Sequence, residues 1–525
     1  MTQKKPSEIY KNSKAAWELK DQWKSVLTEA YSLALAGRNP YVENTNGPKP
    51  MDMQFDGTTP YAVVKLANRI LMELLPPDQN CVSVAPGPLA ELKLPKAQLD
   101  ALKKHLESTS SMLAIVFSSG NFINTFWEML IDYIIAGLGV MLSLEDQTND
   151  VEPAMFQSVS QSEVAVEDDA RGDVGAVYRK RKIKPRNIDT LWTDAKLPKE
   201  LLDLAKKSED KDIEVLEVTY NGRVGKAGAQ KTVWYYEVLW AKEKTDPVRI
   251  VERVYDTNPW TVFRASKLPG SPYGPGYVLL ALPDIRTANK IVEMMLKNAA
   301  LALAGMYLVR DDGVLNPDNI YITPGGMIPV AATDGPLGAS MVPLETGRPF
   351  NLAQALLELY QTNIKKMLFD NGLPEPSAGV RSPTEIIERV RELAQDLGGA
   401  IGRLTVEIVH LVRRVMDILA RRGFVPPMKI DQMTLKVQVN SPLAKARQLQ
   451  EVQTVVQWWT MMQQMGGLQA AMLSGKLEDI GAWMAERMGV PSELVRDATE
   501  RLEYQKNMAQ IASTQATAEM PAQAA

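Results

Sequence analysis

The strongest pattern of hydrophobic and polar positions lies between residues 282 and 423, where three long amphipathic helices are expected. Apolar side chains recur at alternating steps of three and four residues from Ile285 to Val309, which predicts a helix with one apolar side. We expect this first helix to begin at Leu282, with Pro283 in its first turn, where a missing backbone N–H is tolerated. The same helix repeats charged positions on another side: Arg286, Lys290, Glu293 and Lys297.

The third of these helices has clear start and stop signals. Ser382 is a suitable N-cap, Pro383 fits the first helical position, and Glu385 completes a capping box. The apolar side then continues to Gly423, a residue type that commonly follows a helix C-terminus. About 38 residues at 1.5 Å each would extend roughly 57 Å. This length exceeds what a compact domain needs and indicates an elongated subunit that packs beside copies of itself.

The remaining patterns predict a mixed protein, α+β and mainly helical. Other expected helices cover residues 15–36, 60–75, 95–108, 121–136, 199–207 and 352–368, and the chain is helical again from residue 441. A first strand-like run lies at residues 140–144, and from about residue 150 to residue 265 the texture is that of β-strands. The expected strands cover residues 140–144, 158–166, 175–178, 213–220, 233–240, 249–254, 261–263, 319–323 and 327–330.

Composition narrows the class of protein. The chain has 525 residues, 45% of them hydrophobic and 23% charged, as in ordinary soluble proteins. Its net charge of -4 argues against a generic binder of polyanions, although local basic patches are compatible with it. The single cysteine, Cys81, excludes an internal disulfide framework. The most membrane-like segment, residues 122–142, is interrupted by Glu128 and Asp132 and is interpreted as a buried helix, so no membrane is expected.

Candidate catalytic and metal-binding groups are few. Glu407 and His410 have the Glu-x-x-His spacing of di-iron bundles, but such a site needs a second pair, and the other histidine, His105, has none. We therefore interpret His410 as a helix-packing residue. Residues 222–228 contain glycines and Lys226, yet the Ser or Thr of a phosphate-binding loop is missing. We expect no enzyme activity, no metal and no cofactor.

Two basic clusters are candidates for phosphate contact. The first has six basic residues within eight positions, and its structural alternative is a solvated strand edge. The second is a pair of arginine pairs eight residues apart on one helix, which could meet DNA or acidic neighbours, or interact with the helix dipole. The first cluster comprises Arg179, Lys180, Arg181, Lys182, Lys184 and Arg186, and the second comprises Arg413, Arg414, Arg421 and Arg422.

Four segments, in order along the chain, carry a resemblance to a known family. The first is Phe55-Asp56-Gly57-Thr58 with a helix ending Leu74-Leu75-Pro76-Pro77, and the second is Tyr273-Gly274-Pro275-Gly276 before the helix with Pro283. The third is Thr384-Glu385-Ile386-Ile387 with Leu397-Gly398-Gly399 and Glu407, and the fourth lies at residues 503–510. With these segments the chain resembles the portal, or head-to-tail connector, proteins of short-tailed bacteriophages.

The resemblance implies a ring of twelve copies around a channel for double-stranded DNA, at one vertex of the capsid. It implies as partners a terminase, the major capsid protein, a scaffolding protein, tail adaptor and tail proteins, and possible internal core proteins. The virion, after assembly in the host cytoplasm, is the implied location. The implied parts are a wing (1–270), a first stem helix (271–309), a clip (310–348), a second stem helix (349–373), a tunnel loop (374–381), a long helix with a return to the wing (382–440), a helical crown (441–508) and a disordered tail (509–525).

Within this resemblance, Arg381 is the first candidate to face the channel, because it lies in the expected loop between two helices. Lys290, Lys297 and Arg286 follow, since their row could line the channel or equally the outside of the stem. Two other functions stay open at this point. One is a ring-forming adaptor or scaffold through which no DNA passes, and the other is a nucleotide-dependent enzyme, which the missing phosphate loop disfavours.

Overall fold

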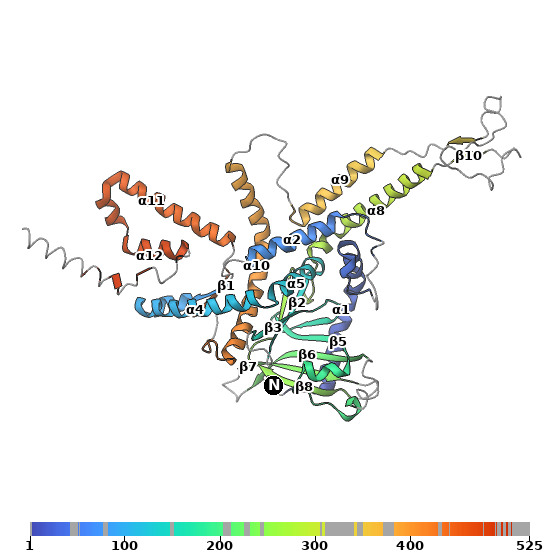
Figure 1. The fold of residues 1–525 in the computed structure, drawn as a ribbon, viewed down its shortest axis with the longest axis horizontal. Helices are drawn as coiled ribbons and strands as arrows, with labels where there is room; N and C mark the ends of the chain where they lie inside the picture. The colour runs from blue at the N-terminus through green and yellow to red at the C-terminus, as the bar shows by residue number, and fades with distance from the viewer. Residues whose placement is uncertain are drawn as a thin grey trace, which may run out of the picture. The chain divides into compact units, whose positions relative to one another are not determined.

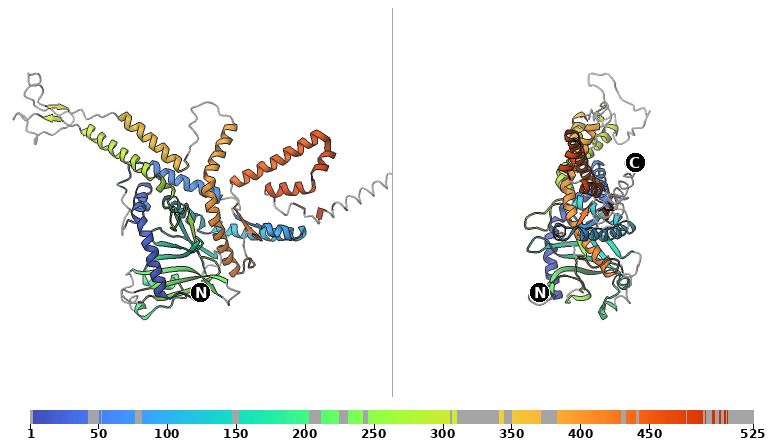
Figure 2. Two further views of the ribbon diagram at one scale, coloured as in Figure 1. Left: turned by 180° about the vertical axis from the view of Figure 1, so that it is seen from behind. Right: turned by 90° about the vertical axis from the view of Figure 1, so that its left-hand side faces the viewer.

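The computed structural model shows a chain of mixed helices and sheets, which confirms the expected α+β class (Figures 1 and 2). Its contacts divide the chain into two compact units. Unit 1 comprises Met1–Ser25, Lys65–Gly276 and Leu373–Ala525, and unit 2 comprises Val26–Val64 and Tyr277–Gly372. The structure describes residues 3–42, 51, 53–76, 82–146, 152–202, 212–224, 231–241, 246–304, 307–309, 341–343, 350–370, 383–428, 433–439, 442–475, 477–488, 490, 495–496, 500–501, 504 and 506.

The largest sheet of unit 1 has five antiparallel strands in the order β4-β5-β6-β7-β8. Neighbours in this sheet are also neighbours in sequence, so successive antiparallel connections build it. The expected single strand over residues 158–166 is wrong, because a turn at 161–163 separates β3 from β4. The strands of this sheet are β4 (Val164–Asp168), β5 (Val174–Ile183), β6 (Ile213–Val224), β7 (Lys231–Trp240) and β8 (Val248–Tyr255), whereas β3 (Ala154–Ser158) belongs to a second sheet.

Both faces of the five-stranded sheet are covered. Helix α1 (Pro6–Ala34) contributes Trp17 to the hydrophobic cluster on one face, and Trp192, after the short helix α6 (Ile188–Leu191), belongs to the cluster on the other. Tyr235 and Tyr236, consecutive on β7, belong to these two different clusters, as the two-residue period of a strand requires. The β-rich segment therefore folds around two layers of apolar side chains.

A second sheet has three strands in the order β3-β2-β9. Side chains of its strands β2 and β9 share one hydrophobic cluster with side chains of β4 and β5 of the larger sheet. Helix α5 packs on β2 and β3, and helix α10 packs on β9 and β2. Helix α5 ends at Gly137, whose φ of 80° is left-handed and favours glycine. The bounds are β2 (Leu138–Glu145), β9 (Trp260–Arg264), α5 (Phe122–Ala136) and α10 (Pro383–Arg421).

The remaining elements of unit 1 include a strand pair that the sequence patterns did not predict. Strands β1 (Val82–Pro86) and β12 (Leu435–Val439) pair antiparallel although about 350 residues separate them in the chain. Helix α4 (Lys96–Ser119) packs against β1 and is longer than the expected segment 95–108. The other elements are α3 (Pro88–Lys93), η1 (Ala36–Arg38) of unit 2, η2 (Pro185–Asn187), α11 (Pro442–Ser474) and α12 (Leu477–Met488).

Unit 2 is built around two helices, α8 (Tyr277–Ala304) and α9 (Phe350–Met367), which pack against each other. The expected start of the first long helix at residue 282 is wrong, because α8 begins at Tyr277 and contains Pro283 in its interior. Pro283 has no N–H to donate to the preceding turn, but the rest of the helix is retained. Strands β10 (Tyr307–Val309) and β11 (Met341–Pro343) pair antiparallel, and α2 (Thr58–Leu74) begins in this unit.

Helix α10 confirms the long helix expected from residue 383. After α10 the chain turns at Gly423, whose φ is 78°. The Gly423 N–H donates to the carbonyl of Ala420 at 3.2 Å, and the Phe424 N–H donates to that of Leu419 at 3.0 Å. These two bonds form a Schellman motif, which explains why the helix stops at the predicted glycine.

Several expectations lie outside the described residues. They are the N-cap Ser382, the strands at 319–323 and 327–330, the tunnel loop at 374–381 and the tail at 509–525. The division into wing, stem, clip and crown stays a prediction. Among the described helices, none combines the length and the apolar character that a membrane crossing requires.

Candidate nucleic-acid interface

The charged row of α8 forms where the sequence predicts it, and its members neutralise one another. The Lys290 and Lys297 ammonium groups both contact the Glu293 carboxylate, at 2.9 Å and 2.5 Å. The hydrogen bond from Lys297, and then that from Lys290, lower the pKa of Glu293 below its usual range. Both lysines remain exposed, so these three residues present one net positive charge to solvent.

Arg286, the first member of the row, has a different partner. Its guanidinium donates two parallel hydrogen bonds, of 2.7 and 2.8 Å, to the carboxylate of Glu29 on α1. In this bidentate geometry two N–H groups on one edge of the planar guanidinium donate to the two carboxylate oxygens. These hydrogen bonds raise the pKa of Arg286. Within unit 2 the arginine therefore holds α8 to the second half of α1, and its charge is largely compensated.

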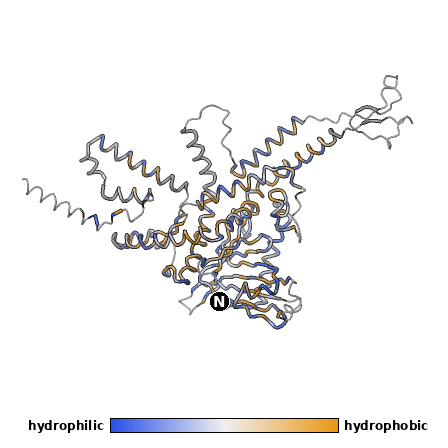
Figure 3. The backbone as a smooth tube through the Cα atoms, viewed as in Figure 1, coloured by the Kyte–Doolittle hydropathy of each residue, from blue (hydrophilic) through white to orange (hydrophobic). Residues whose placement is uncertain are grey.

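The other sides of the two unit 2 helices carry exposed apolar residues. On α9, Leu352, Leu356 and Leu359 follow the spacing of one helix face and remain 65%, 41% and 55% exposed. On α8, Leu280 and Met294 are exposed as well. Figure 3 shows hydrophobic and hydrophilic positions mixed along both helices. An apolar row of this length on a surface is typical of a contact with another chain.

The expected tunnel-loop residue Arg381 lies outside the described residues, so its placement stays a prediction. The structure brings Lys290 and Lys297 together through Glu293 and leaves them accessible. It thus supplies an exposed charged side and an exposed apolar side on the same pair of helices. Both sides are needed if α8 and α9 pass between a channel and neighbouring copies.

The basic run on β5 is divided between interior and surface. The alternative of a strand edge is confirmed for part of the run, since β5 pairs with β6 as far as Ile183 but with β4 only as far as Arg179. Arg179 is buried and contacts the carboxylates of Glu163 at 2.9 Å and Glu217 at 3.4 Å. Burial with two carboxylates removes Arg179 from any phosphate-binding surface. Lys180, on the opposite face, lies 4.5 Å from the ring centroid of Trp17.

The other members of this run are accessible to different extents. Lys182 and Arg186 are exposed, while Arg181 and Lys184 are partly buried. Arg181 shares Glu217 with Arg179, at 3.6 Å. The run is therefore not a single basic patch, because its side chains alternate between the two faces of a sheet.

The arginine cluster of α10 has acidic neighbours. Arg414 is fully buried and donates to the carbonyl of Ser143 at 3.1 Å. Its guanidinium also lies 3.4 Å from Asp417. Burial lowers the pKa of Arg414 to about 10, so the group stays charged at neutral pH. DNA contact by Arg414 is excluded, because its side chain has no accessible surface in unit 1.

The other arginines of this cluster lie nearer the surface. Arg421 contacts Asp417 at 3.1 Å and Glu145 at 3.7 Å, and Arg422 contacts Glu145 at 3.3 Å. These pairs join the end of α10 to the end of β2. Arg413 is partly buried. Arg421 and Arg422 therefore attach the helix to the sheet. Contact with acidic neighbours was one of the alternatives that the sequence left open beside contact with DNA.

Glu407 and His410 both lie on α10, and charged groups outside this helix, Arg264 and Asp173, act on Glu407. Burial, opposed by Arg264 and reinforced by Asp173, raises the pKa of Glu407 to about 7. His410 itself is exposed on α10, so its interpretation as a helix-packing residue is wrong. Among the described residues, no group of three or more potential ligands could hold a metal ion. Glu407, which is partly buried, is therefore a pH-sensitive group of α10.

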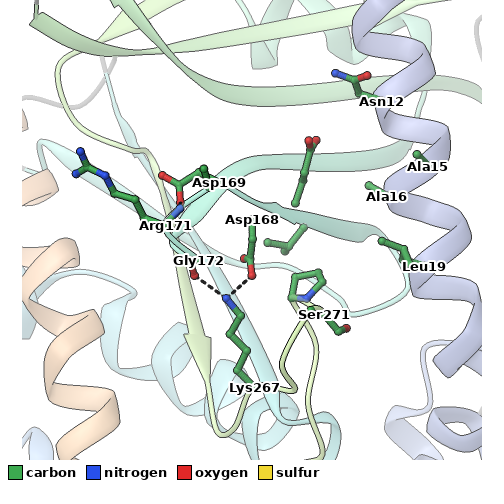
Figure 4. A pocket seen from close by; sticks show the side chains of 15 residues that line it. Asn12, Ala15, Ala16, Leu19, Asp168, Asp169, Arg171, Gly172, Lys267 and Ser271 are labelled. Carbon is green, nitrogen blue, oxygen red and sulfur yellow. Dashed lines mark hydrogen bonds and ion pairs between the residues drawn. The ribbon is translucent and has the colours of Figure 1, made fainter.

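Figure 4 shows a pocket of about 570 Å³ in unit 1, between α1, the β4–β5 turn and the segment after β9. Most of its charged side chains already have partners within the protein. The Lys267 ammonium donates to the Gly172 carbonyl at 2.7 Å and pairs with Asp168. The Asp169 carboxylate accepts the N–H groups of Arg171 and Asp173. These hydrogen bonds and the ion pair stabilise the β4–β5 turn, so the conformation of this turn needs no ligand to explain it.

Comparison with known proteins gives the family. The family model described as "Bacteriophage head to tail connecting protein" matches residues 7–495. The portal protein of Enterobacteria phage T3 is 22% identical over 440 residues, which are 80% of this chain and 77% of that protein. The match spans both units, including α8, α9 and α10. The chain belongs to the family of bacteriophage head-to-tail connecting proteins.

Proposed function

We propose that copies of this chain form a ring, with twelve as the expected number, around a channel through which double-stranded DNA is packaged and ejected. The ring would occupy one capsid vertex and join head to tail. The family match supports this role. The observation that carries the assembly is the exposed leucine row of α9, at Leu352, Leu356 and Leu359.

Ring closure needs two different surfaces that fit each other, because a cyclic assembly repeats a head-to-tail contact. The surfaces of unit 2 that we propose for this contact are the leucine row of α9 and the exposed Leu280 and Met294 of α8. Burial of an exposed leucine contributes about 2 kcal/mol. Repeated at each contact around a ring, a few such side chains would contribute to lateral association.

The charges of α8 suit a channel that lets DNA slide. Each phosphate neutralised by a lysine or arginine adds affinity that depends steeply on salt. Twelve copies of a strongly basic row would hold the DNA. In α8 the pairing of Lys290 and Lys297 with Glu293 leaves a weak net charge, and Arg286 is compensated by Glu29. We propose Lys290 and Lys297, together with Arg381, as the channel-facing residues.

The proposed partners follow from the family's place between head and tail. They are a terminase, the major capsid protein, a scaffolding protein, the tail adaptor and tail proteins, and internal core proteins. Packaging energy would come from the terminase, so this chain acts as a conduit and an assembly platform. Its place would be the head–tail junction of the virion, after assembly in the host cytoplasm.

The assembly proposal is tested with Leu356→Glu, which places a carboxylate in the leucine row of α9. We expect wild-type protein to sediment as a ring and the variant to sediment as monomers or short oligomers. The control is Gln354→Lys, which adds a charge on a different side of the same helix, beside Glu358. It should assemble normally. A Leu356→Glu variant that forms wild-type rings would contradict the assignment of this surface.

A further inference from the structure

Lys20 of α1 occupies a position that the helix otherwise fills with apolar side chains. The same face carries Ile9, Ala16, Leu27 and Tyr31, all of them buried. Lys20 itself is only 3% exposed. A lysine is rarely buried to this extent without a carboxylate partner, since removing an ammonium group from water is costly.

Lys20 has few polar contacts for a buried amine. Its Nζ atom hydrogen-bonds to the Oε1 atom of Gln161 at 2.8 Å and lies 4.9 Å from the ring centroid of Tyr273. Gln161 is fully buried and donates in turn to the Leu138 carbonyl. No ion pair joins Lys20 to a carboxylate among the described residues. An ammonium group has three donors, and this site supplies one acceptor and one ring face.

Charged groups on two helices act on Lys20 without contacting it. Asp132 on α5 and Asp21 on α1 raise its pKa, but burial has the larger effect and lowers the pKa to about 7. Tyr273, which covers the amine, is itself near Asp168, Arg264 and Asp21. Lys20 therefore changes charge close to neutral pH inside the protein.

Tyr273 belongs to the segment that connects β9 to α8. Its hydroxyl accepts the N–H of Val166 at 2.9 Å, and its carbonyl accepts the N–H of Leu268 at 3.2 Å. Val166 lies on β4, the edge strand of the five-stranded sheet, so this N–H has no partner strand on its side. The side chain that Lys20 contacts therefore also accepts the Val166 hydrogen bond, which joins the connecting segment to the sheet.

We propose that Lys20 is a proton-operated latch: its neutral amine keeps the segment 266–276 docked on unit 1, and protonation loosens that segment. Protonation adds a third N–H donor to a buried site that supplies one acceptor and one ring face, and this donor gains water only if Tyr273 moves away. The device acts on the stretch of chain that leads into α8. It goes beyond the proposed conduit role, because a conduit needs no titrating group at this place.

The size of the effect follows from linkage between proton binding and opening. An opened lysine has the ordinary pKa of 10.5, whereas the docked one has a pKa of about 7. Lowering the pH from about 8.5 to about 6 then increases the opened population roughly thirtyfold. Above pH 10.5 the amine is neutral in both states and the latch exerts no pH dependence.

The test is hydrogen–deuterium exchange of the full-length assembled protein, with the exchange of the Val166 N–H and of the segment 266–276 corrected for intrinsic pH dependence. In the wild type we expect protection to fall about thirtyfold between about pH 8.5 and about pH 6. Lys20→Met, similar in shape but without charge, should remove this dependence and stay protected at both values. Lys11→Met, at an exposed lysine of the same helix, should respond as the wild type does.

Two results would overturn the proposal. One is equal corrected protection of Val166 in the wild type at both pH values, which needs no variant and holds even if Lys20→Met folds poorly. The other is a Lys20→Met protein that keeps the full pH response. Failure of the latch leaves the ring proposal untouched, because the sedimentation of Leu356→Glu tests that proposal through a different unit.

Discussion

The guanidinium of Arg414 lies 4.3 Å from the ring centroid of Tyr255, so the buried charge of α10 rests on the last residue of strand β8. Arg421, two turns later, lies 5.3 Å from the same ring. The ring of Tyr255 thus contacts the guanidinium groups of two arginines of one helix. Since α10 also packs on β9 and β2, this contact fixes the second half of the long helix to the sheets of unit 1.

We expect Arg414→Met to destabilise unit 1 by about 3–5 kcal/mol, because it removes the buried guanidinium that contacts both Asp417 and the Ser143 carbonyl, although Asp417 keeps Thr257 and Arg421. Arg421→Met, at a more exposed position, should cost about 1 kcal/mol or less. Chemical denaturation followed by tryptophan fluorescence measures both. Equal losses for the two variants would show that the buried contact does not dominate the attachment of α10.

Backbone packing at Gly276 leads to a second prediction. A Cβ atom at this position would lie 2.4 Å from the Gly137 nitrogen and 2.7 Å from the Ile135 carbonyl oxygen. Neither backbone atom can move independently, so Gly276→Ala should cost about 3 kcal/mol. The measurement is thermal unfolding of the purified protein.

Gly398→Ala is the matched control for Gly276→Ala. Gly398 lies within α10, and a Cβ atom there would meet no atom within 4 Å. Alanine should therefore stabilise the helix by about 0.5–1 kcal/mol. If Gly276→Ala unfolded at the wild-type temperature, the close contact between residues 137 and 276 would be refuted.

The raised pKa of Glu407 predicts a pH dependence of stability. Its pKa is about 7 in the folded protein and 4.5 when unperturbed, so the folded state binds the proton more tightly. The stabilisation is complete below pH 4.5 and is lost as the pH rises to about 7. Glu407→Gln should therefore raise the melting temperature by about 5 °C near pH 8. Near pH 4.5 it should have little effect, and an equal gain at both values would contradict the assignment.

The charge of the α8 row can be altered at Glu293. Glu293→Gln releases Lys290 and Lys297 from their shared partner and adds one positive charge per copy. If the row faces DNA, the slope of log affinity against log salt should steepen by about 0.9 for each added phosphate contact. Binding of duplex DNA to assembled rings at several salt concentrations measures the slope.

Glu91→Gln on α3 changes the net charge by the same amount at an exposed position of unit 1. It should leave the salt dependence of DNA binding as in the wild type. Identical slopes for Glu293→Gln and the wild type would place the row on the outside of the stem, the alternative that the sequence left open.

The sequence predicted the long helix α10 well because its ends are set locally. A proline at its first position and a glycine after its end act within one turn, so the pattern determines both ends. The start of α8 was missed for the opposite reason. Gly276 is held by contacts with residues 134–137, which fixes where the helix begins and leaves Pro283 inside it.

The sequence patterns also did not predict that two charged side chains are buried. Arg414 and Lys20 both lie on apolar helix faces, Arg414 between Leu411 and Ile418 and Lys20 between Ala16 and Leu27. This interruption of an apolar row was the available signal. Strands β1 and β12 gave no comparable signal, because their pairing depends on a partner about 350 residues away.

The central claim is that α8 and α9 form the wall of a channel between neighbouring copies, and electron cryomicroscopy of the purified assembly tests it most directly. We expect a closed ring, with twelve copies, whose bore is near the width of duplex DNA, about 20 Å. Lys290 and Lys297 should face the bore, and the leucine row of α9 should be buried against the next copy. A monomer, or a ring with α8 on its outer surface, would contradict the claim.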